Sequence, residues 1–303
     1  MTCLAQALKM LPMQDPRFVD VDGIRTRYFE AGSGPPMVLV HGGSIGSSYN
    51  AYHWSLNFDE LAKRFHVYAL DKLGNGHTDN PLADADYTMA AVIAHVHGFL
   101  RTMQIENAVL VGHSRGALPV TRIAIDDPAR CSALVILDTN TLAPEDPSTP
   151  SDFYRKLEVA PVESNEEYAS REPIANSYST AHMTDDFVQA AADVVALEKT
   201  WAALAKMKTL GGSTFQPDVR AQRADTLEMI AAGRLNVPML IAWGLDDPSA
   251  PIKLGMDLLG IVGPALPHVR LHVFNRAGHY AFREHAAEMN RLIAAFVYEV
   301  EAR

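Results

Sequence analysis

A serine between two glycines is the residue most able to act as a nucleophile in this chain. Residues 112–116 read Gly-His-Ser-Arg-Gly and follow the apolar run Ala108–Val111. This G-x-S-x-G pattern, before a predicted helix over Ala117–Ile125, indicates a sharp turn that exposes the hydroxyl of Ser114. Pro119 predicts a kink or a tight first turn in that helix. Because a serine before a helix can also be a simple N-cap, the assignment depends on partners elsewhere in the chain.

A serine hydroxyl needs a general base, and the base needs an acid that orients it. The best candidate base is His279, and the best candidate acid is Asp247; each follows a predicted strand. Asp246 and Asp138 are the alternatives for the acid. The order Ser114, Asp247, His279 differs from the orders of chymotrypsin and subtilisin and is typical of hydrolases with this serine turn.

Short apolar runs alternate with helical segments along most of the chain. The predicted strands are Phe18–Val21, Arg25–Glu30, Met37–Val40, Phe65–Leu70, Ala108–Val111, Ala133–Leu137, Val237–Trp243 and Val269–Phe274. The predicted helices are Thr88–Met103, Ala117–Ile125, Asp185–Lys206, Gln222–Ala232 and Ala286–Val300. Asp22-Gly23 predicts a hairpin between the first two strands. The alternation indicates an α/β protein with a mostly parallel sheet covered by helices on both faces.

The alternation stops near Ala143, where prolines punctuate a polar stretch, and it resumes with the strand at Val237. We therefore expect a core domain made of residues 1–142 and 236–303. Residues 143–235 are expected to form a helical lid inserted into it.

Composition restricts the possible partners. The 303 residues carry 26 basic and 36 acidic side chains, a net charge of −10, which disfavours nucleic-acid binding. Two cysteines are too few for a disulfide framework, and the histidines show no metal-binding spacing, so no metal and no cofactor are expected. Neither a signal peptide nor a membrane span is recognisable, which predicts a cytoplasmic protein.

The motifs together resemble the α/β-hydrolase superfamily over nearly the whole chain. They are His41-Gly42-Gly43, Gly112–Gly116, Gly244-Leu245-Asp246-Asp247 and Gly278-His279. The resemblance implies an eight-stranded sheet with the lid after the sixth strand. It also implies an oxyanion hole made by the backbone N–H groups of Gly43 and Arg115, with Ser44 as an alternative donor.

The segment from Gly278 to Leu292 is similar to the meta-cleavage-product hydrolases, which cleave a C–C bond in dienoates from aromatic-ring degradation. In that family an aromatic residue follows the catalytic histidine, as Tyr280 does here. The family's lid arginine, which grips the dienoate carboxylate, corresponds to Ala191, and no arginine lies between Arg171 and Arg220.

This departure, together with unusual residues beside the serine at His113 and Arg115, favours a neighbouring branch. The leading hypothesis is a serine hydrolase that cleaves an ester of a small aromatic acid, such as a monoalkyl phthalate, through an acyl-enzyme. The alternative is a C–C hydrolase of a 2-hydroxy-6-oxo-dienoate, and a third reading is a non-catalytic ligand-binding relative. The resemblance allows a homodimer. Candidate substrate-binding residues are Ser44, Asn50, His113, Tyr280 and Trp201.

Overall fold

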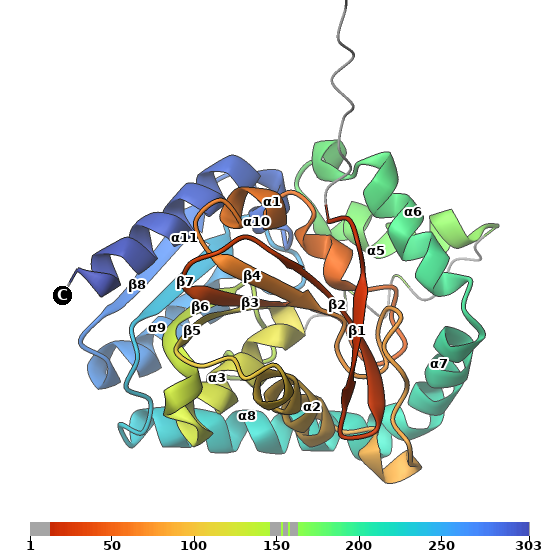
Figure 1. Ribbon diagram of the computed structural model, residues 1–303, viewed down its shortest axis with the longest axis horizontal. Helices are drawn as coiled ribbons and strands as arrows, with labels where there is room; N and C mark the ends of the chain where they lie inside the picture. Colours follow the sequence, from red (N-terminus) through yellow and green to blue (C-terminus); the bar gives the residue numbers. More distant parts are fainter. Residues whose placement is uncertain (1–12, 146–152, 154–156, 158–162, 303) are drawn as a thin grey trace, which may run out of the picture.

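The computed structural model describes residues 13–145, 153, 157 and 163–302 (Figure 1). Its centre is one eight-stranded sheet with the order β1-β2-β4-β3-β5-β6-β7-β8. The strands are β1 (Arg17–Val21), β2 (Ile24–Ala31), β3 (Pro36–Val40), β4 (His66–Leu70), β5 (Ala108–His113), β6 (Cys131–Leu137), β7 (Met239–Gly244) and β8 (Val269–Phe274). β1 and β2 pair antiparallel, as do β2 and β4, and the other neighbours are parallel. The predicted fold class is confirmed.

The predicted hairpin joins β1 to β2 at a two-residue turn. Val21 pairs with Ile24, and the backbone φ angles of Asp22 and Gly23 are +51° and +88°. Two positive φ angles define the turn type that matches the twist of a hairpin, and Asp-Gly is among the pairs that adopt it most readily.

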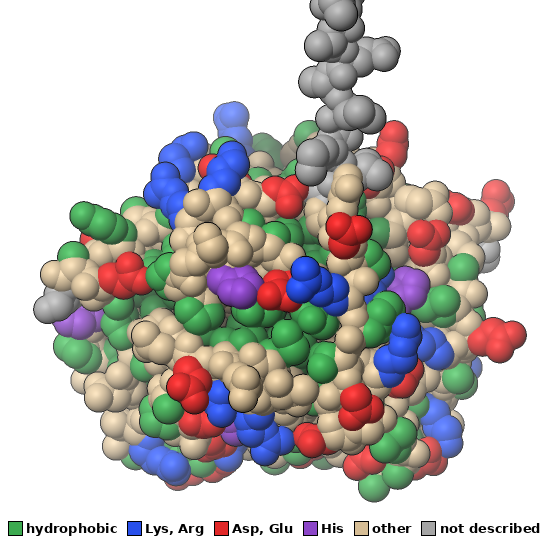
Figure 2. All heavy atoms as spheres, in the orientation of Figure 1, with side chains coloured by type: hydrophobic (Ala, Val, Ile, Leu, Met, Phe, Trp, Pro, Cys, Tyr) green, Lys and Arg blue, Asp and Glu red, His purple; other side chains and the backbone are tan. Residues whose placement is uncertain are grey.

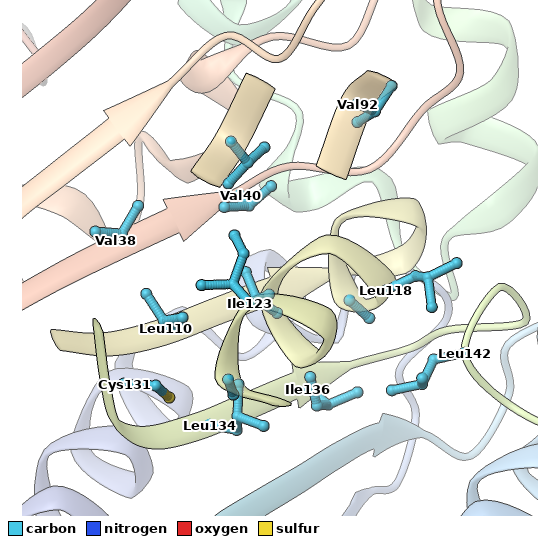
Figure 3. Packing of buried hydrophobic residues seen from close by; sticks show 14 of the residues in the cluster. Val38, Val40, Val92, Leu110, Leu118, Ile123, Cys131, Leu134, Ile136 and Leu142 are labelled. Atoms are coloured by element: carbon cyan, nitrogen blue, oxygen red, sulfur yellow. The ribbon is translucent and has the colours of Figure 1, made fainter. Parts of the chain in front are cut away.

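Helices cover both faces of the sheet, as Figure 1 shows. One layer contains α2 (Met89–Thr102), α3 (Ala117–Asp126), α8 (Gln216–Ala231) and α9 (Ile252–Ala265), and the other contains α1 (Phe58–Leu61), α10 (Ala281–Glu284) and α11 (Ala286–Glu301). Each layer encloses its own apolar core. Figure 3 shows the first core, where strand residues Val38, Leu110 and Ile136 face helix residues Leu118 and Ile123. Burial on both faces explains why these strands read as continuous apolar runs.

Most of the described residues between β6 and β7 form helices. These inserted helices are α5 (Asn165–Asn176), α6 (Asp185–Val195), α7 (Glu198–Leu210) and α8, with a short π-helical stretch over Gly211–Phe215. The helix predicted over Asp185–Lys206 is wrong as a single element, because Leu197 has an extended backbone and separates α6 from α7. The helix predicted over Gln222–Ala232 begins six residues earlier than expected.

The last inserted helix does not lie with the others. α8 packs against α2, α3 and α9, whereas α5 and α6 pack together (Figure 1). The lid boundaries at residues 143 and 235 stay a prediction, and α8 contributes to the helical layer of the core in any case.

One face of the molecule carries side chains of both charge signs, which Figure 2 shows interspersed. Within the described ranges, the helices are all too short or too polar to cross a membrane.

Candidate active site

The candidate nucleophile occupies a strained turn. Ser114 follows β5 directly, has a φ of +52° and is only 5% exposed. A non-glycine residue rarely adopts this left-handed conformation, and such strain is concentrated at functional sites. A side chain at Gly112 would collide with Gly116 and Ala117, and one at Gly116 would collide with the carbonyl of Val40. Both glycines are thus required for the turn to form.

The helix after the serine has the tight first turn that Pro119 predicts. Residues Ser114–Gly116 form one 3₁₀ turn, and α3 begins at Ala117. The amide of Arg115 lies in this turn, where N–H groups lack helical partners and point outward. It is therefore suited to bind an anion.

The candidate base and acid are in direct contact. Nδ1 of His279 lies 2.6 Å from Oδ2 of Asp247, and both side chains are fully buried. Oδ1 of Asp247 accepts the N–H groups of Ser249 and Ala250 at 2.8 and 2.7 Å, which fixes the carboxylate. Within the described residues, Nε2 of His279 is buried and makes no hydrogen bond. Hydrogen bonds between nucleophile and base often tighten only when substrate is bound.

The environment favours the protonated imidazole. Burial by itself lowers the pKa of His279, but the charge and hydrogen bond of Asp247, with the charge of Glu172, outweigh it and raise the pKa above its usual value. The backbone N–H of His279 donates to the carbonyl of Asn176 at 2.7 Å, which ties the histidine loop to α5.

The two alternative acids do not reach this histidine. Asp246 is exposed. Asp138, at the end of β6, is buried and accepts the N–H of Gly244 at 2.7 Å. Burial and the nearby charge of Asp247 raise the pKa of Asp138 well above its usual value, which favours the neutral form of this second carboxyl.

A buried lysine fixes the glycine loop after β3. Gly43 has a φ of +76°, and a Cβ there would lie 2.6 Å from the side chain of Tyr49. Nζ of Lys72 donates to the carbonyls of Gly42 and Gly43, both at 2.8 Å. These bonds hold the peptide groups of the loop in one orientation, and the N–H of Gly43 stays the proposed second oxyanion donor. Burial, aided by the charge of Arg115, lowers the pKa of Lys72.

Two tyrosines join the histidine loop to the inserted helices. The hydroxyls of Tyr280 and Tyr49 lie 2.6 and 3.0 Å from Oε2 of Glu172 on α5. Oε1 of Glu172 accepts the side-chain N–H of Asn176 at 2.6 Å. This arrangement places a carboxylate beside the residue that follows the candidate base.

The other predicted substrate-binding residues have different surroundings. Nε2 of His113 bonds the carbonyl of His279 at 2.9 Å, and the two rings lie 4.8 Å apart. Asn50 is buried and caps the 3₁₀ helix Ala51–Trp54. The carbonyl of Ser44 accepts a hydrogen bond from Asn75. Trp201 on α7 is 48% exposed and packs against Tyr168, and its role in binding substrate stays a prediction.

Sequence reasoning missed four residues of this region: Tyr49, Lys72, Glu172 and Arg283. Lys72 follows the end of β4, where polar side chains of a parallel sheet gather, and this position could have identified it. Glu172 lies on a weakly amphipathic helix that gives no such signal. Arg283 is buried and donates to the carbonyls of His53 and His182, so it links the core to the inserted segment.

The described residues contain no group of three side chains arranged to hold a metal ion. The groups present can instead support acyl transfer to a serine, with a paired histidine as base and backbone amides as oxyanion donors.

Comparison with known proteins agrees with this chemistry. The chain belongs to the α/β-hydrolase fold family, whose model matches residues 35–286. It is 27% identical over 290 residues to a 2-hydroxy-6-oxo-6-(2'-aminophenyl)hexa-2,4-dienoic acid hydrolase of Metapseudomonas resinovorans, covering 93% of this chain and 90% of that protein. It is 28% identical over 292 residues to a 2-hydroxymuconate semialdehyde hydrolase of Pseudomonas sp. (strain CF600), covering 92% and 93%.

Solved structures show the same fold. A meta-cleavage product hydrolase from Pseudomonas fluorescens IP01 (CumD) superimposes with a TM-score of 0.75 at 24% identity, covering 93% of this chain and 97% of that one. The protein is thus an α/β hydrolase, and each of these three relatives matches 92% or 93% of the chain.

Proposed function

We propose that the protein hydrolyses a C–C bond in a meta-cleavage product, a 2-hydroxy-6-oxo-dienoate derived from an aromatic ring. The observation that carries the proposal is the buried hydrogen bond between His279 and Asp247. The strained backbone of Ser114, and similarity over 92% or 93% of the chain to two hydrolases of such compounds, support it. These similarities favour C–C hydrolysis over the hydrolysis of an aromatic monoester. The ester hypothesis is based on the residues at positions 113, 115 and 191, which differ from those of the C–C hydrolases.

In the proposed mechanism the dienoate first shifts the proton of its 2-hydroxyl to C5. This shift converts C2 to a ketone and makes C5 a saturated carbon that can leave from the 6-oxo carbonyl. Ser114 attacks this carbonyl while His279 takes the hydroxyl proton and Asp247 stabilises the imidazolium. The N–H groups of Gly43 and Arg115 bind the developing oxyanion. Collapse breaks the C–C bond, and the leaving carbon, stabilised as an enolate, takes the proton from His279.

Water then hydrolyses the acyl-enzyme with His279 as base, which releases a carboxylic acid and regenerates Ser114. The net reaction adds one water across the C–C bond, and no further reactant is required.

Steady-state turnover of a phenyl-substituted 6-oxo-dienoate and of monobutyl phthalate by the same preparation tests the proposal. We expect efficient loss of the dienoate chromophore with little release of butanol, and loss of turnover in Ser114→Ala. Butanol release with an intact dienoate would refute C–C hydrolysis and establish the ester reading.

One observation keeps the ester hydrolase as the second candidate. Residue 191, where the resemblance places the lid arginine of the C–C hydrolases, is an alanine that is 2% exposed. A dienoate needs a cationic partner for its carboxylate, and the other basic groups of the site must supply it.

A further inference from the structure

A cavity of about 230 Å³ lies beside the nucleophile turn and is lined by two arginines. Arg115 comes from the turn itself, and Arg223 comes from α8. Asn140 and Glu145 line it from the segment after β6, and Ser249 lines it from the segment after β7. The cavity therefore adjoins both the nucleophile turn and the acid, since Ser249 bonds the carboxylate of Asp247.

The charges around this cavity are mainly positive. The side chain of Arg223 is 11% exposed and pairs with Glu145, whose side chain is 59% exposed. Its Nη1 donates to the carbonyl of Asn140 at 3.3 Å, so further N–H donors of the guanidinium are left for a ligand. The guanidinium of Arg115 lies 5.5 Å from the ring of Phe215, and its charge acts on the buried Lys72.

The opposite side of the site carries a negative charge. Glu172 contacts the hydroxyls of Tyr49 and Tyr280, next to the candidate base. A substrate carboxylate placed there would meet a like charge. Arg283, the other nearby cation, is 1% exposed and already donates to protein acceptors at His53 and His182.

General bond and side-chain lengths are compatible with a dienoate that reaches from Ser114 to an arginine of the cavity. The Cα atoms of Ser114 and Arg115 are about 3.8 Å apart, as in any trans peptide, and an arginine side chain extends roughly 7 Å from its Cα. The carboxylate of a 2-hydroxy-6-oxo-dienoate lies five bonds from the carbonyl that is attacked, roughly 6 Å along an extended chain. A carboxylate in the cavity and a carbonyl at Ser114 are therefore compatible.

We propose that Arg115 and Arg223 form a carboxylate-binding subsite that orients the substrate, with its carboxylate away from Glu172. This inference rests on the proposed function and names the partner of the dienoate carboxylate in a chain whose residue 191 is alanine. Arginine suits the task because its planar donors bind both carboxylate oxygens at once.

The first test compares Arg223→Met with wild type, with Arg223→Lys as the conservative variant. The matched control is Arg220→Met, an exposed position on the same helix. The readout is inhibition of p-nitrophenyl acetate hydrolysis by benzoate and by benzamide, which needs no C–C cleavage.

We expect Arg223→Met to weaken benzoate inhibition at least about tenfold relative to benzamide inhibition of the same variant, and Arg223→Lys to recover part of the loss. Arg220→Met should behave as wild type. Arg115→Met is the second variant. It too should weaken inhibition by benzoate more than inhibition by benzamide. Unchanged benzoate inhibition in both Arg223→Met and Arg115→Met would overturn the subsite.

The dienoate and its methyl ester separate this inference from the proposed function. For the dienoate, Arg223→Met should raise KM about tenfold or more while kcat stays near wild type, and the methyl ester should be insensitive. Weaker benzoate binding in Arg223→Met, together with no dienoate cleavage by wild type, would retain the subsite and refute the C–C activity. An equal rise in KM for the dienoate and its methyl ester in Arg223→Met would refute carboxylate recognition.

Discussion

Replacing Glu172 by glutamine tests whether an inserted helix acts on the catalytic histidine. The carboxylate accepts hydrogen bonds at both oxygens, from Tyr49 and Tyr280 at Oε2 and from Asn176 at Oε1. A glutamine has one acceptor oxygen and one amide group, so one of these contacts becomes unfavourable. The substitution also removes a negative charge that raises the pKa of His279.

The size of the electrostatic effect follows from the geometry. The rings of His279 and Tyr280 lie 6.0 Å apart, and 2.6 Å separates the Tyr280 hydroxyl from Glu172. With the length of a phenol added, the carboxylate lies within roughly 11 Å of the imidazole, where two unit charges interact by about 1.5 kcal/mol at an effective dielectric constant near 20. Such an energy corresponds to about one pH unit in a titration.

The assay is the pH dependence of kcat/KM with p-nitrophenyl acetate, which reports the free enzyme. His279 acts as a base only when neutral, so activity rises with pH through its pKa. Removing the charge of Glu172 lowers that pKa, and the acidic limb of the profile should move to lower pH by about one unit. Glu166→Gln, at an exposed position on the same helix, should leave the limb unchanged.

The same substitution should lower the free energy of unfolding, because hydrogen bonds to a charged acceptor contribute about 1.5–3 kcal/mol each and those to a neutral one about half as much. A merely structural role of Glu172 would reduce stability without moving the limb. An unchanged limb in a folded Glu172→Gln protein would therefore refute electrostatic coupling between α5 and the histidine.

Three further outcomes follow from the site. Asp247→Asn should lower kcat by about four orders of magnitude in steady-state turnover, because the amide favours the wrong tautomer of His279. Asp138→Asn should leave kcat nearly unchanged, since burial and the charge of Asp247 raise the pKa of Asp138 and favour its neutral form, which asparagine resembles; a large loss of kcat would contradict this. Lys72→Met should lower kcat about 10- to 100-fold with little change in KM, because the oxyanion loop loses two hydrogen bonds, and a pure KM effect would contradict this.

Most of the fold could be predicted because its strands and turns are indicated by residues close together in the sequence. Buried parallel strands read as apolar runs, and the Asp22-Gly23 turn specifies its own backbone geometry. The division between α6 and α7 was not predictable, because the apolar periodicity continues across it. The break at Leu197 is fixed by a contact outside that pattern, the bond from the Thr200 hydroxyl to the carbonyl of Val194.

The residues of the candidate site could likewise be predicted only where the signal is local. Ser114, Asp247 and His279 each follow a strand, and a parallel sheet brings the ends of its strands to one edge, so their spacing in the sequence indicates a common site. Glu172 reaches that edge through contacts with two residues more than one hundred positions away, Tyr49 and Tyr280. No periodicity in α5 indicates which of its acids faces inward.

The strand ends and the inserted helices contribute different groups to the selection of substrate. The strand ends supply groups that suit any acyl transfer, whereas α5 supplies Glu172 and α8 supplies Arg223. The two inserted helices thus bring opposite charges to the region around one nucleophile, and a substrate with a single carboxylate can lower its energy in only one orientation. Since α8 is packed against α2, α3 and α9, its arginine is held by the rigid core, and only the acidic side depends on how α5 is seated. Carboxylate binding should therefore persist in variants that loosen α5, while the pH dependence of turnover should not.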